Sequence, residues 1–242
     1  MKNLILSTFL LLAALCLGQM PKPVWELNLN EGDFDAIAST GSRLFKAKAF
    51  AKEKLEWGPG RLGGKALYFK NDVNCKEKPI ASIEIPATEH FDFSKPFTAM
   101  CWFKPDTGLK GTMQYTIFGN TPSDYGPGFR MLYGWGSLRA TMGQGTAKTG
   151  GGFAVPPSKV KVARGTWNHI AISNDGNLLR IYYNGIEVAS TDKKIYPVAK
   201  ARPFSIGSYN HYAYGYNGGI CEFKLFDVAL TPEQILTIAK EL

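Results

Sequence analysis

Histidine and cysteine are scarce in this sequence of 242 residues, which has three histidines and four cysteines. The histidines, His90, His169 and His211, are far apart, and no cysteine spacing resembles that of a zinc site, so no structural zinc is expected. The sequence also lacks the Gly-x-Ser-x-Gly elbow of serine hydrolases and the spacing of a phosphate-binding loop. These absences remove familiar signatures of metal-dependent, nucleophilic and nucleotide-dependent chemistry.

Long hydrophobic runs are missing as well, apart from one at the start of the chain. Met1-Lys2-Asn3 precedes an apolar run at residues 4–17, which is too short to cross a membrane. The run ends in Leu17-Gly18, so we expect residues 1–18 to be a secretory signal peptide that is removed, and the protein to be secreted, extracellular or periplasmic. Leu15 stands where lipoprotein signals have a small residue, so no lipid is expected on Cys16.

Acidic residues are outnumbered, with 20 Asp and Glu against 28 Lys and Arg, which gives a net charge of +8. Removal of Lys2 with the signal peptide would leave +7. The scattered lysines are typical of a solvated surface that keeps a protein soluble. The alternative is attraction to an acidic extracellular polymer, such as a uronic-acid or sulfated glycan. No nucleic-acid-binding motif is found, and nucleic acid is not expected as a partner.

Glycine, proline and aromatic residues are well represented, with 26 glycines, 14 prolines and 13% aromatics. This composition favours many short strands joined by tight turns over long helices or disorder. Residues 19–23 are predicted to be a short linker, and residues 24–242 one domain, because no repeat or low-complexity tract interrupts them. The fold class is therefore predicted to be all-β.

The clearest local pattern is a three-stranded meander at residues 168–190. Asp175-Gly176 and Asn184-Gly185 separate three alternating apolar runs, and both dipeptides tolerate the positive φ of hairpin turns. Near the end of the chain, Thr231-Pro232-Glu233-Gln234 supplies an N-cap, a proline at the first helical position and the Gln of a capping box. A short C-terminal helix, with Ile235, Ile238 and Leu242 on one stripe, is expected to close one end of the domain.

Four segments repeat the motifs of a known family, in the family's order. They are WGPGRLGGKALYF at 57–69, PFTAMCWFKP at 96–105, WNHIA at 167–171 and GGICEFKLF followed by ALTPEQI at 218–235. With the opening strand at 24–29, they resemble the laminin-G-like jelly-roll domains of the concanavalin A-like lectin/glucanase superfamily. The resemblance covers essentially the whole mature chain. It implies a two-sheet antiparallel jelly-roll sandwich with a short C-terminal helix.

The resemblance also suggests roles for individual residues. Trp102, Trp167 and Phe223 are expected in the core, and His169 is expected to be a hydrogen-bonded structural residue rather than a catalyst. Cleavage after Gly18 leaves Cys75, Cys101 and Cys221, which allow at most one internal disulfide. The family places Cys101 and Cys221 inside strands, where we expect them to be buried on neighbouring strands; whether they form a disulfide is open. Cys75, in a Lys-rich loop, is the expected free thiol.

Enzymatic activity is not expected. Glycoside hydrolysis usually needs two carboxylates flanking the scissile bond, and the Glu-x-Asp-x-Glu strand of the sandwich glucanases has no counterpart here. Glu84 is alone on its predicted strand, and Glu222 is expected to be structural.

A glycan-binding site is predicted in the tyrosine-rich segment between the last two strands. Its candidate carbohydrate-binding residues are Tyr209, Asn210, Tyr212, Tyr214 and Tyr216. Aromatic rings can support the apolar face of a sugar, while amides fix its hydroxyls. The competing interpretation is that these tyrosines tuck onto the edge of the core. A second aromatic cluster, a weaker candidate, contains Tyr125, Phe129, Tyr133 and Trp135.

Calcium is suggested only by a partial resemblance of residues 115–125 to a pentraxin segment. Asp124, Asn120 and Asn210 are weak candidate ligands, because calcium prefers six to eight oxygens with several carboxylates among them. No cofactor is required by the sequence.

Three functions remain open at this point. The first is a secreted, non-catalytic glycan-binding or adhesive module, whose partner is an extracellular glycan that could be acidic. The second is a structural extracellular or cell-envelope protein that binds another extracellular protein. The third is an unrecognised glycan-active hydrolase or lyase.

Overall fold

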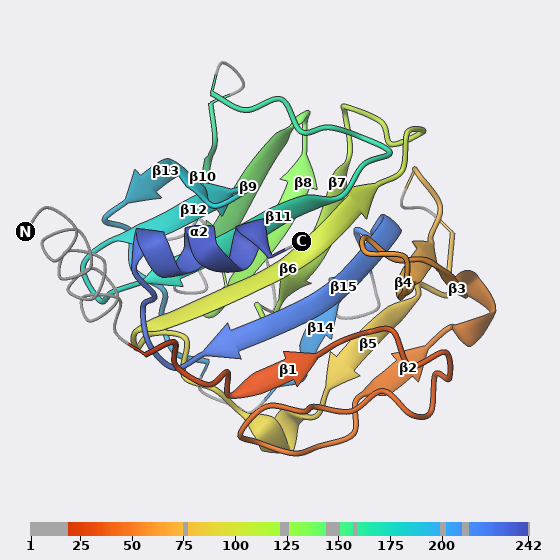
Figure 1. Cartoon of the computed structure of the whole chain (residues 1–242). Coiled ribbons are helices and arrows are strands. Elements are labelled where there is room, and N and C mark those ends of the chain that lie inside the picture. The colour runs from red at the N-terminus through yellow and green to blue at the C-terminus, as the bar shows by residue number, and fades with distance from the viewer. Residues whose placement is uncertain are drawn as a thin grey trace, which may run out of the picture.

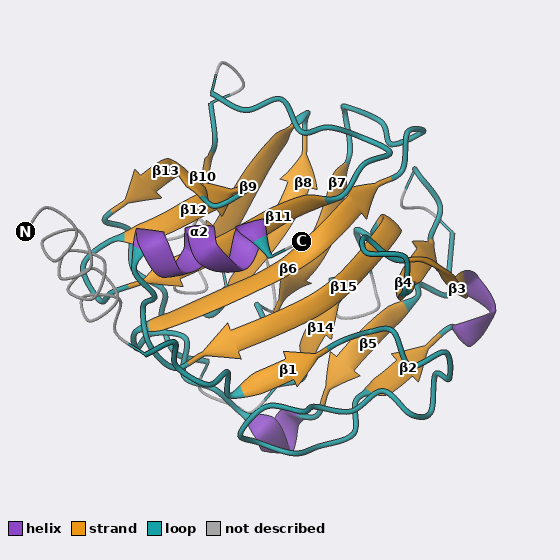
Figure 2. Ribbon diagram, in the orientation of Figure 1, coloured by secondary structure: helices purple, strands orange, loops and turns teal. Residues whose placement is uncertain are grey.

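The computed structural model of the protein describes residues 19–74, 77–121, 126–143, 151–156, 159–198, 202–209 and 213–241. Two antiparallel sheets face one another in this structure (Figures 1 and 2). The predicted signal peptide and Cys75 lie outside the described residues. The two-sheet antiparallel sandwich predicted from the sequence is confirmed.

One sheet has eight strands. Its order is β13 (Ile186–Thr191), β12 (Leu179–Tyr183), β11 (Asn168–Asn174), β6 (Phe97–Pro105), β15 (Asn217–Phe226), β4 (Lys65–Lys70) and β3 (Leu55–Pro59), with β1 (Trp25–Leu27) paired to β15. In Figure 1 this sheet forms the front layer. Strands distant in sequence are neighbours here, because β6 lies between β11 and β15.

The second sheet has seven strands. Its order is β10 (Gly151–Ala154), β9 (Ser137–Met142), β8 (Phe129–Gly134), β7 (Gln114–Gly119), β14 (Phe204–Ile206), β5 (Ser82–Ile85) and β2 (Lys48–Phe50). Two short 3-10 helices, Lys52–Lys54 and Ala87–Glu89, lie in the connections.

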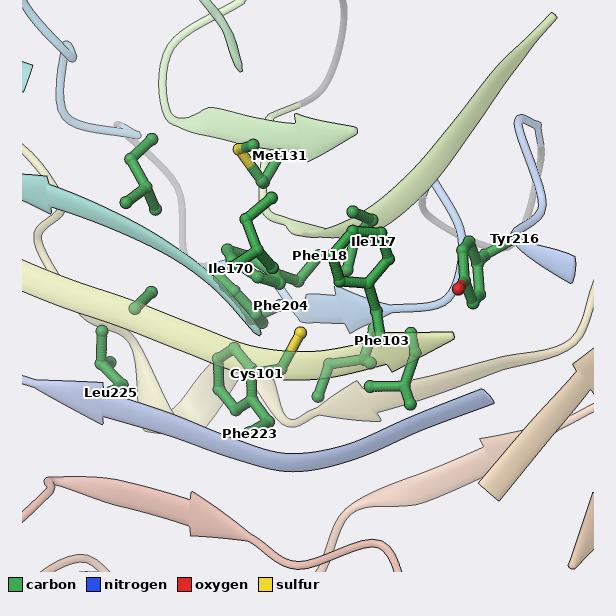
Figure 3. Packing of buried hydrophobic residues seen from close by; sticks show 14 of the residues in the cluster. Cys101, Phe103, Ile117, Phe118, Met131, Ile170, Phe204, Tyr216, Phe223 and Leu225 are labelled. Atoms are coloured by element: carbon green, nitrogen blue, oxygen red, sulfur yellow. The ribbon is translucent and has the colours of Figure 1, made fainter. Parts of the chain in front are cut away.

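An aromatic core fills the space between the sheets. Phe118 and Phe204 each lie 5.4 Å, ring centroid to centroid, from Phe223, which is fully buried as predicted (Figure 3). Alternation along the strands directs these rings inward from both sheets. Burial of each such ring contributes about 1.5 to 3 kcal/mol relative to an exposed position.

The predicted meander is confirmed as β11, β12 and β13, paired in sequence order. At the turn between β12 and β13, Asn184 has φ 48° and Gly185 has φ 82°. These are the two positive φ angles of a type I′ turn, for which Asn-Gly is the preferred pair. The Asn184 side chain also accepts a hydrogen bond from the His169 amide, at 2.8 Å.

The C-terminal helix α2 (Pro232–Lys240) begins at the predicted capping box, in which Thr231 and Gln234 exchange hydrogen bonds. It was expected to close one end of the sandwich, and this is wrong. Ile235 and Ile238 pack with Met100 and Tyr182 on the outer face of the eight-stranded sheet (Figure 1). Leu242 lies outside the described residues.

An arginine fastens the end of this helix to the sheet. Arg61 forms two hydrogen bonds with the Glu222 carboxylate, at 2.9 and 3.1 Å, and donates a third to the Glu241 carbonyl. Its guanidinium carbon lies 4.4 Å from the centroid of the Trp102 ring. Glu222 thus has the structural role expected for it.

Trp102 and Trp167 differ from their prediction, because both are only half-buried. Each lies on the outer face of the eight-stranded sheet: Trp102 under Arg61, and Trp167 edge-on to Tyr68 at 6.2 Å. Cys101 precedes Trp102, so its side chain points the other way, into the core (Figure 3). Cys221 is the register partner of Trp102 and therefore faces outward. The cysteines lie on neighbouring strands, as predicted, but both are free, because their thiols are on opposite faces.

His169 shares the outer face with Trp102 and is 1% exposed. Its ring nitrogens have no hydrogen-bond partner, so the hydrogen bond expected for this ring is absent. Burial, aided by the positive charges of Arg61 and Lys224, lowers the pKa of His169 to about 3. The imidazole is therefore neutral at physiological pH, as suits a structural residue.

No helix in the described part of the chain is long and apolar enough to cross a membrane.

Candidate functional site

A row of polar residues crosses the outer face of the seven-stranded sheet. The register places Glu84 opposite Ser205, Ser205 opposite Gly119, Gly119 opposite Arg130, and Arg130 opposite Thr141. Apolar neighbours such as Ile83, Phe129 and Ile206 point into the core, so alternation directs this row outward. Glu84, Ser205 and Arg130 are nevertheless at most 7% exposed.

Several hydroxyl groups on this face lack a partner. The side-chain oxygens of Ser82, Thr116, Thr141 and Ser205 are buried and form no hydrogen bond. Buried polar atoms are normally paired, so a group of four on one face needs an explanation. Hydroxyls can both donate and accept, which suits them to a polar ligand or to water.

Arg130 organises one end of the face. Its Nη2 donates to Gln114 Oε1 at 2.9 Å, and its guanidinium carbon lies 4.8 Å from the ring centroids of both Tyr209 and Tyr214. The two rings are 6.0 Å apart and inclined by 59°. A desolvated guanidinium attracts aromatic faces by about 2 kcal/mol, so Arg130 helps to hold both rings in place.

The backbone positions the tyrosines next to the sheet. Gly207 N–H donates to Ile117 C=O and Thr116 N–H donates to Tyr214 C=O, each at 2.8 Å. Tyr209 N–H in turn donates to Ala213 C=O at 3.0 Å. The segment after β14 therefore continues beside β7, with both rings at Arg130.

The structure places the predicted carbohydrate-binding residues in different environments. Tyr209 and Tyr214 come together, and each residue is half-buried. Asn210 and Tyr212 lie outside the described residues. Tyr216 is fully buried, edge-on to Phe69 at 6.3 Å (Figure 3), and burial raises its pKa well above the usual value. The prediction for Tyr216 is wrong, because its ring belongs to the core.

Arg130, Gln114 and the unpartnered hydroxyls were not anticipated. The sequence does contain a signal for Arg130, since it alternates with Phe129 and Met131 within a run of apolar residues. A charged residue at the outward position of such a strand marks a face with a polar role.

The predicted calcium ligands do not assemble among the described residues. Asn120 is 4% exposed, and its Oδ1 accepts a hydrogen bond from Phe129 N–H at 3.2 Å. Asp124 and Asn210 lie outside the described ranges. Within those ranges, no group of three His, Cys, Asp or Glu residues could hold a metal ion.

Carboxylates are equally sparse on this face. Glu84 is the one acidic residue on the seven described strands of the sheet. A hydrolase of the usual kind would need a second carboxylate across the scissile bond.

Of the second aromatic cluster, Phe129 is in the core and Tyr125 lies outside the described residues. Tyr133 lines a cavity of about 570 Å³, and Trp135, which is 48% exposed, precedes Gly136 in that lining. The cavity lies between the turn that joins β8 to β9 and residues 161–164, which lead to β11.

Residues 80–236 match the sequence profile of a family described as the concanavalin A-like lectin/glucanases superfamily. The chain belongs to this superfamily. The polar row and its two tyrosines therefore occupy the outer face of a concanavalin A-like sandwich. No curated protein matches the sequence.

Solved structures with a similar fold include domain 4 of AbnA, a GH43 extracellular arabinanase from Geobacillus stearothermophilus, in complex with arabinotriose. It is 20% identical, with a TM-score of 0.64, over 90% of this chain and 98% of that one. The binding domain of Paraclostridial Mosquitocidal Protein 1 is 15% identical, with a TM-score of 0.65, over 90% of this chain and 52% of that one. The botulinum neurotoxin serotype G binding domain is 14% identical, with a TM-score of 0.64, over 90% of this chain and 50% of that one. This concanavalin A-like chain spans about half the length of the toxin domains. At these identities the similarity shows a shared fold.

Proposed function

We propose that this protein is a secreted, non-catalytic glycan-binding module, with its site on the outer face of the seven-stranded sheet. The observation that carries the proposal is the pair of half-buried tyrosines, Tyr209 and Tyr214, held by Arg130 beside hydroxyl groups that have no partner. The arabinotriose complex of a similarly folded arabinanase domain supports this choice of ligand class.

Each part of the site suits a sugar. The C–H face of a sugar ring stacks on an aromatic ring that is accessible and fixed in orientation. The cation–π contacts with Arg130 help to fix these two rings. The buried hydroxyls of Thr116 and Ser205 can pair with water molecules that bridge to a sugar. The single carboxylate, Glu84, favours binding without hydrolysis.

Isothermal titration against neutral oligosaccharides, including arabinotriose, and against neutral and acidic polysaccharides tests the proposal. The double variant Tyr209→Ala/Tyr214→Ala should bind at least about fivefold more weakly, because stacking on each ring is worth about 0.5 to 1.5 kcal/mol. Tyr214→Phe keeps the ring and should retain most of the affinity.

Tyr68→Ala is the matched control, since Tyr68 is a half-buried tyrosine on the outer face of the opposite sheet. It should leave glycan affinity unchanged. Failure of the parent protein to bind any glycan in the panel would refute the proposal and favour a protein partner instead. Equal affinity of parent and double variant would show that the tyrosines are not the site.

A further inference from the structure

The positive charge of this protein is concentrated in one part of the chain. Residues 107–174 contain seven basic residues and one acidic residue, a net charge of +6, against +8 for the whole sequence. The basic residues are Lys110, Arg130, Arg139, Lys148, Lys159, Lys161 and Arg164, and the acid is Asp124. Such a local imbalance attracts anions more strongly than scattered charge does.

A cavity of about 570 Å³ lies within this basic part. It is lined by Tyr133 and Gly136 from the β8–β9 hairpin and by the segment Lys161-Val162-Ala163-Arg164. Figure 1 shows this segment passing the upper ends of β8 and β9 before it enters β11. Alternation sorts its side chains: Val160 and Val162 join the core, while Lys159 and Lys161 are exposed. The valines thereby anchor a wall that presents lysines to solvent.

Arg164 is fixed at this cavity by neutral groups. Its Nε and Nη2 donate to the Tyr133 hydroxyl, at 3.3 and 3.1 Å, and its Nη1 donates to the Leu109 carbonyl at 2.6 Å. In the described ranges no carboxylate forms an ion pair with Arg164 or Lys161. The cavity therefore keeps its positive potential, and one of its two cations is already oriented.

An exposed tryptophan stands at the same hairpin. Trp135 is 48% exposed, and the Arg139 guanidinium carbon lies 4.5 Å from its ring centroid. Trp135 has φ 50° and Gly136 has φ 75°, so a bulky residue occupies a left-handed position that favours Asn or Gly. Such strain on a side chain with little packing points to a functional role for the ring.

The hairpin adjoins the tyrosine site. Gln114, which accepts the hydrogen bond from Arg130, is the register partner of Gly134, the residue before Trp135. Leu132, two residues after Arg130 on β8, is the partner of Arg139 on β9. An extended polymer could therefore contact the tyrosines and the hairpin together.

We infer that the cavity and the Trp135 hairpin form a subsite for an acidic sugar unit, one that carries a carboxylate or a sulfate ester. The inference rests on the proposed function and deepens it by naming the ligand class. Trp135 stacks on the ring of the acidic unit, the exposed Lys161 ammonium contacts its anionic group, and Arg164 and Arg139 add positive charge.

Polygalacturonate, its fully methyl-esterified form and heparin are suitable probes, with arabinotriose as a neutral ligand of the tyrosine site. The parent should bind polygalacturonate or heparin at least tenfold more tightly than the esterified polymer in low salt, and that advantage should shrink as salt is added. Binding of polygalacturonate would show that the subsite accepts a carboxylate, and binding of heparin alone would show that it requires a sulfate ester.

Two variants and one control locate the subsite. Lys161→Glu should abolish the preference for the acidic polymer. Trp135→Asn should weaken binding of the acidic polymer at least fivefold without disturbing the fold, because Asn suits the left-handed backbone at this position. Lys46→Glu makes the same change of charge at an exposed lysine before β2, outside the basic segment, and should change the affinity less than twofold. Neither subsite variant should alter affinity for a neutral ligand held by the tyrosines.

Three results would overturn the inference. The first is equal weakening by Lys161→Glu and Lys46→Glu, which would show attraction by net charge alone. The second is glycan binding that is lost in Tyr209→Ala/Tyr214→Ala but unchanged, in affinity and salt dependence, in both subsite variants; the proposed function would then stand alone. The third is absence of binding to every probe, which would overturn both proposals.

Discussion

Two hairpins of this sandwich have the same kind of turn and differ in the residue that occupies it. The β12–β13 turn has Asn184-Gly185 at φ 48° and 82°, and the β8–β9 turn has Trp135-Gly136 at φ 50° and 75°. Asn184 suits a left-handed backbone and also accepts a hydrogen bond from the His169 amide. Trp135 suits that backbone poorly and leaves almost half of its surface in solvent.

The difference separates a turn whose residue supports the fold from one for which we propose a role in binding. In the first turn, the local preference of the residue and its long-range contact favour the same structure. In the second, the residue opposes the local preference, and the proposed subsite next to the basic cavity would account for its retention. Sites where sequence and local conformation disagree are often functional ones.

The largest expected effect on stability comes from placing a tryptophan, the residue of the β8–β9 turn, in the β12–β13 turn. Asn184→Trp should lower the free energy of unfolding by about 2 to 4 kcal/mol, because it forces a bulky residue into the left-handed region and leaves the His169 amide without its partner. Denaturant unfolding measures this change. Asn184→Gly, which keeps the turn and removes only the hydrogen bond, should lose about half as much. A loss below 1 kcal/mol for Asn184→Trp would remove the contrast between the turns.

Acid should loosen the same turn through His169. Its folded pKa of about 3 lies below the unfolded value of 6.5, so the unfolded chain binds the proton first. Stability is then full above pH 6.5 and is lost as the pH falls from 6.5 toward 3. The loss between pH 7 and pH 5 should be about 2 kcal/mol.

Denaturation midpoints across this range measure the effect. His169→Leu should flatten the slope between pH 7 and pH 5, whereas His90→Gln, at an exposed histidine, should leave it unchanged. An unaltered slope in His169→Leu would assign the acid sensitivity to other groups.

The smallest effect concerns the Trp135 turn itself. Trp135→Asn should raise the free energy of unfolding by up to about 1 kcal/mol, since relief of backbone strain exceeds the lost contact with Arg139. Calorimetry should show a Tm increase of about 2 °C for a domain of this size. Destabilisation by more than 1 kcal/mol would mean that the indole supports the fold, and the contrast with Asn184 would fail.

Local signals allowed much of the fold to be predicted. Asn184-Gly185 and the Thr231–Gln234 capping box each act within a few residues, so the meander and the helix were predicted correctly. The position of the helix was not, because its apolar stripe does not specify which surface receives it. Trp102 has the alternation of an outward residue, yet the sequence does not say how much of that face the helix covers.

The candidate site depends on register between distant strands. Arg130 meets Tyr214 because the segment after β14 runs beside β7, a pairing that brings together residues 84 positions apart. Tyr214 and Tyr216 look alike in sequence, but one faces Arg130 and the other the core. Cys101 and Cys221 illustrate the same limit of sequence-based prediction. Their positions on neighbouring strands were predicted, but the opposite directions of their side chains were not.

The clasp between Arg61, Glu222 and the Glu241 carbonyl has a practical consequence for handling the protein. It holds the end of α2 against the outer face of the eight-stranded sheet, on the side of the molecule opposite the polar row and the tyrosines (Figure 1). A sensor chip or bead coupled through a tag after Glu241 would therefore orient the molecules with the seven-stranded sheet toward the solution. Immobilised in this way, the protein would meet a soluble polysaccharide with its candidate site unobstructed.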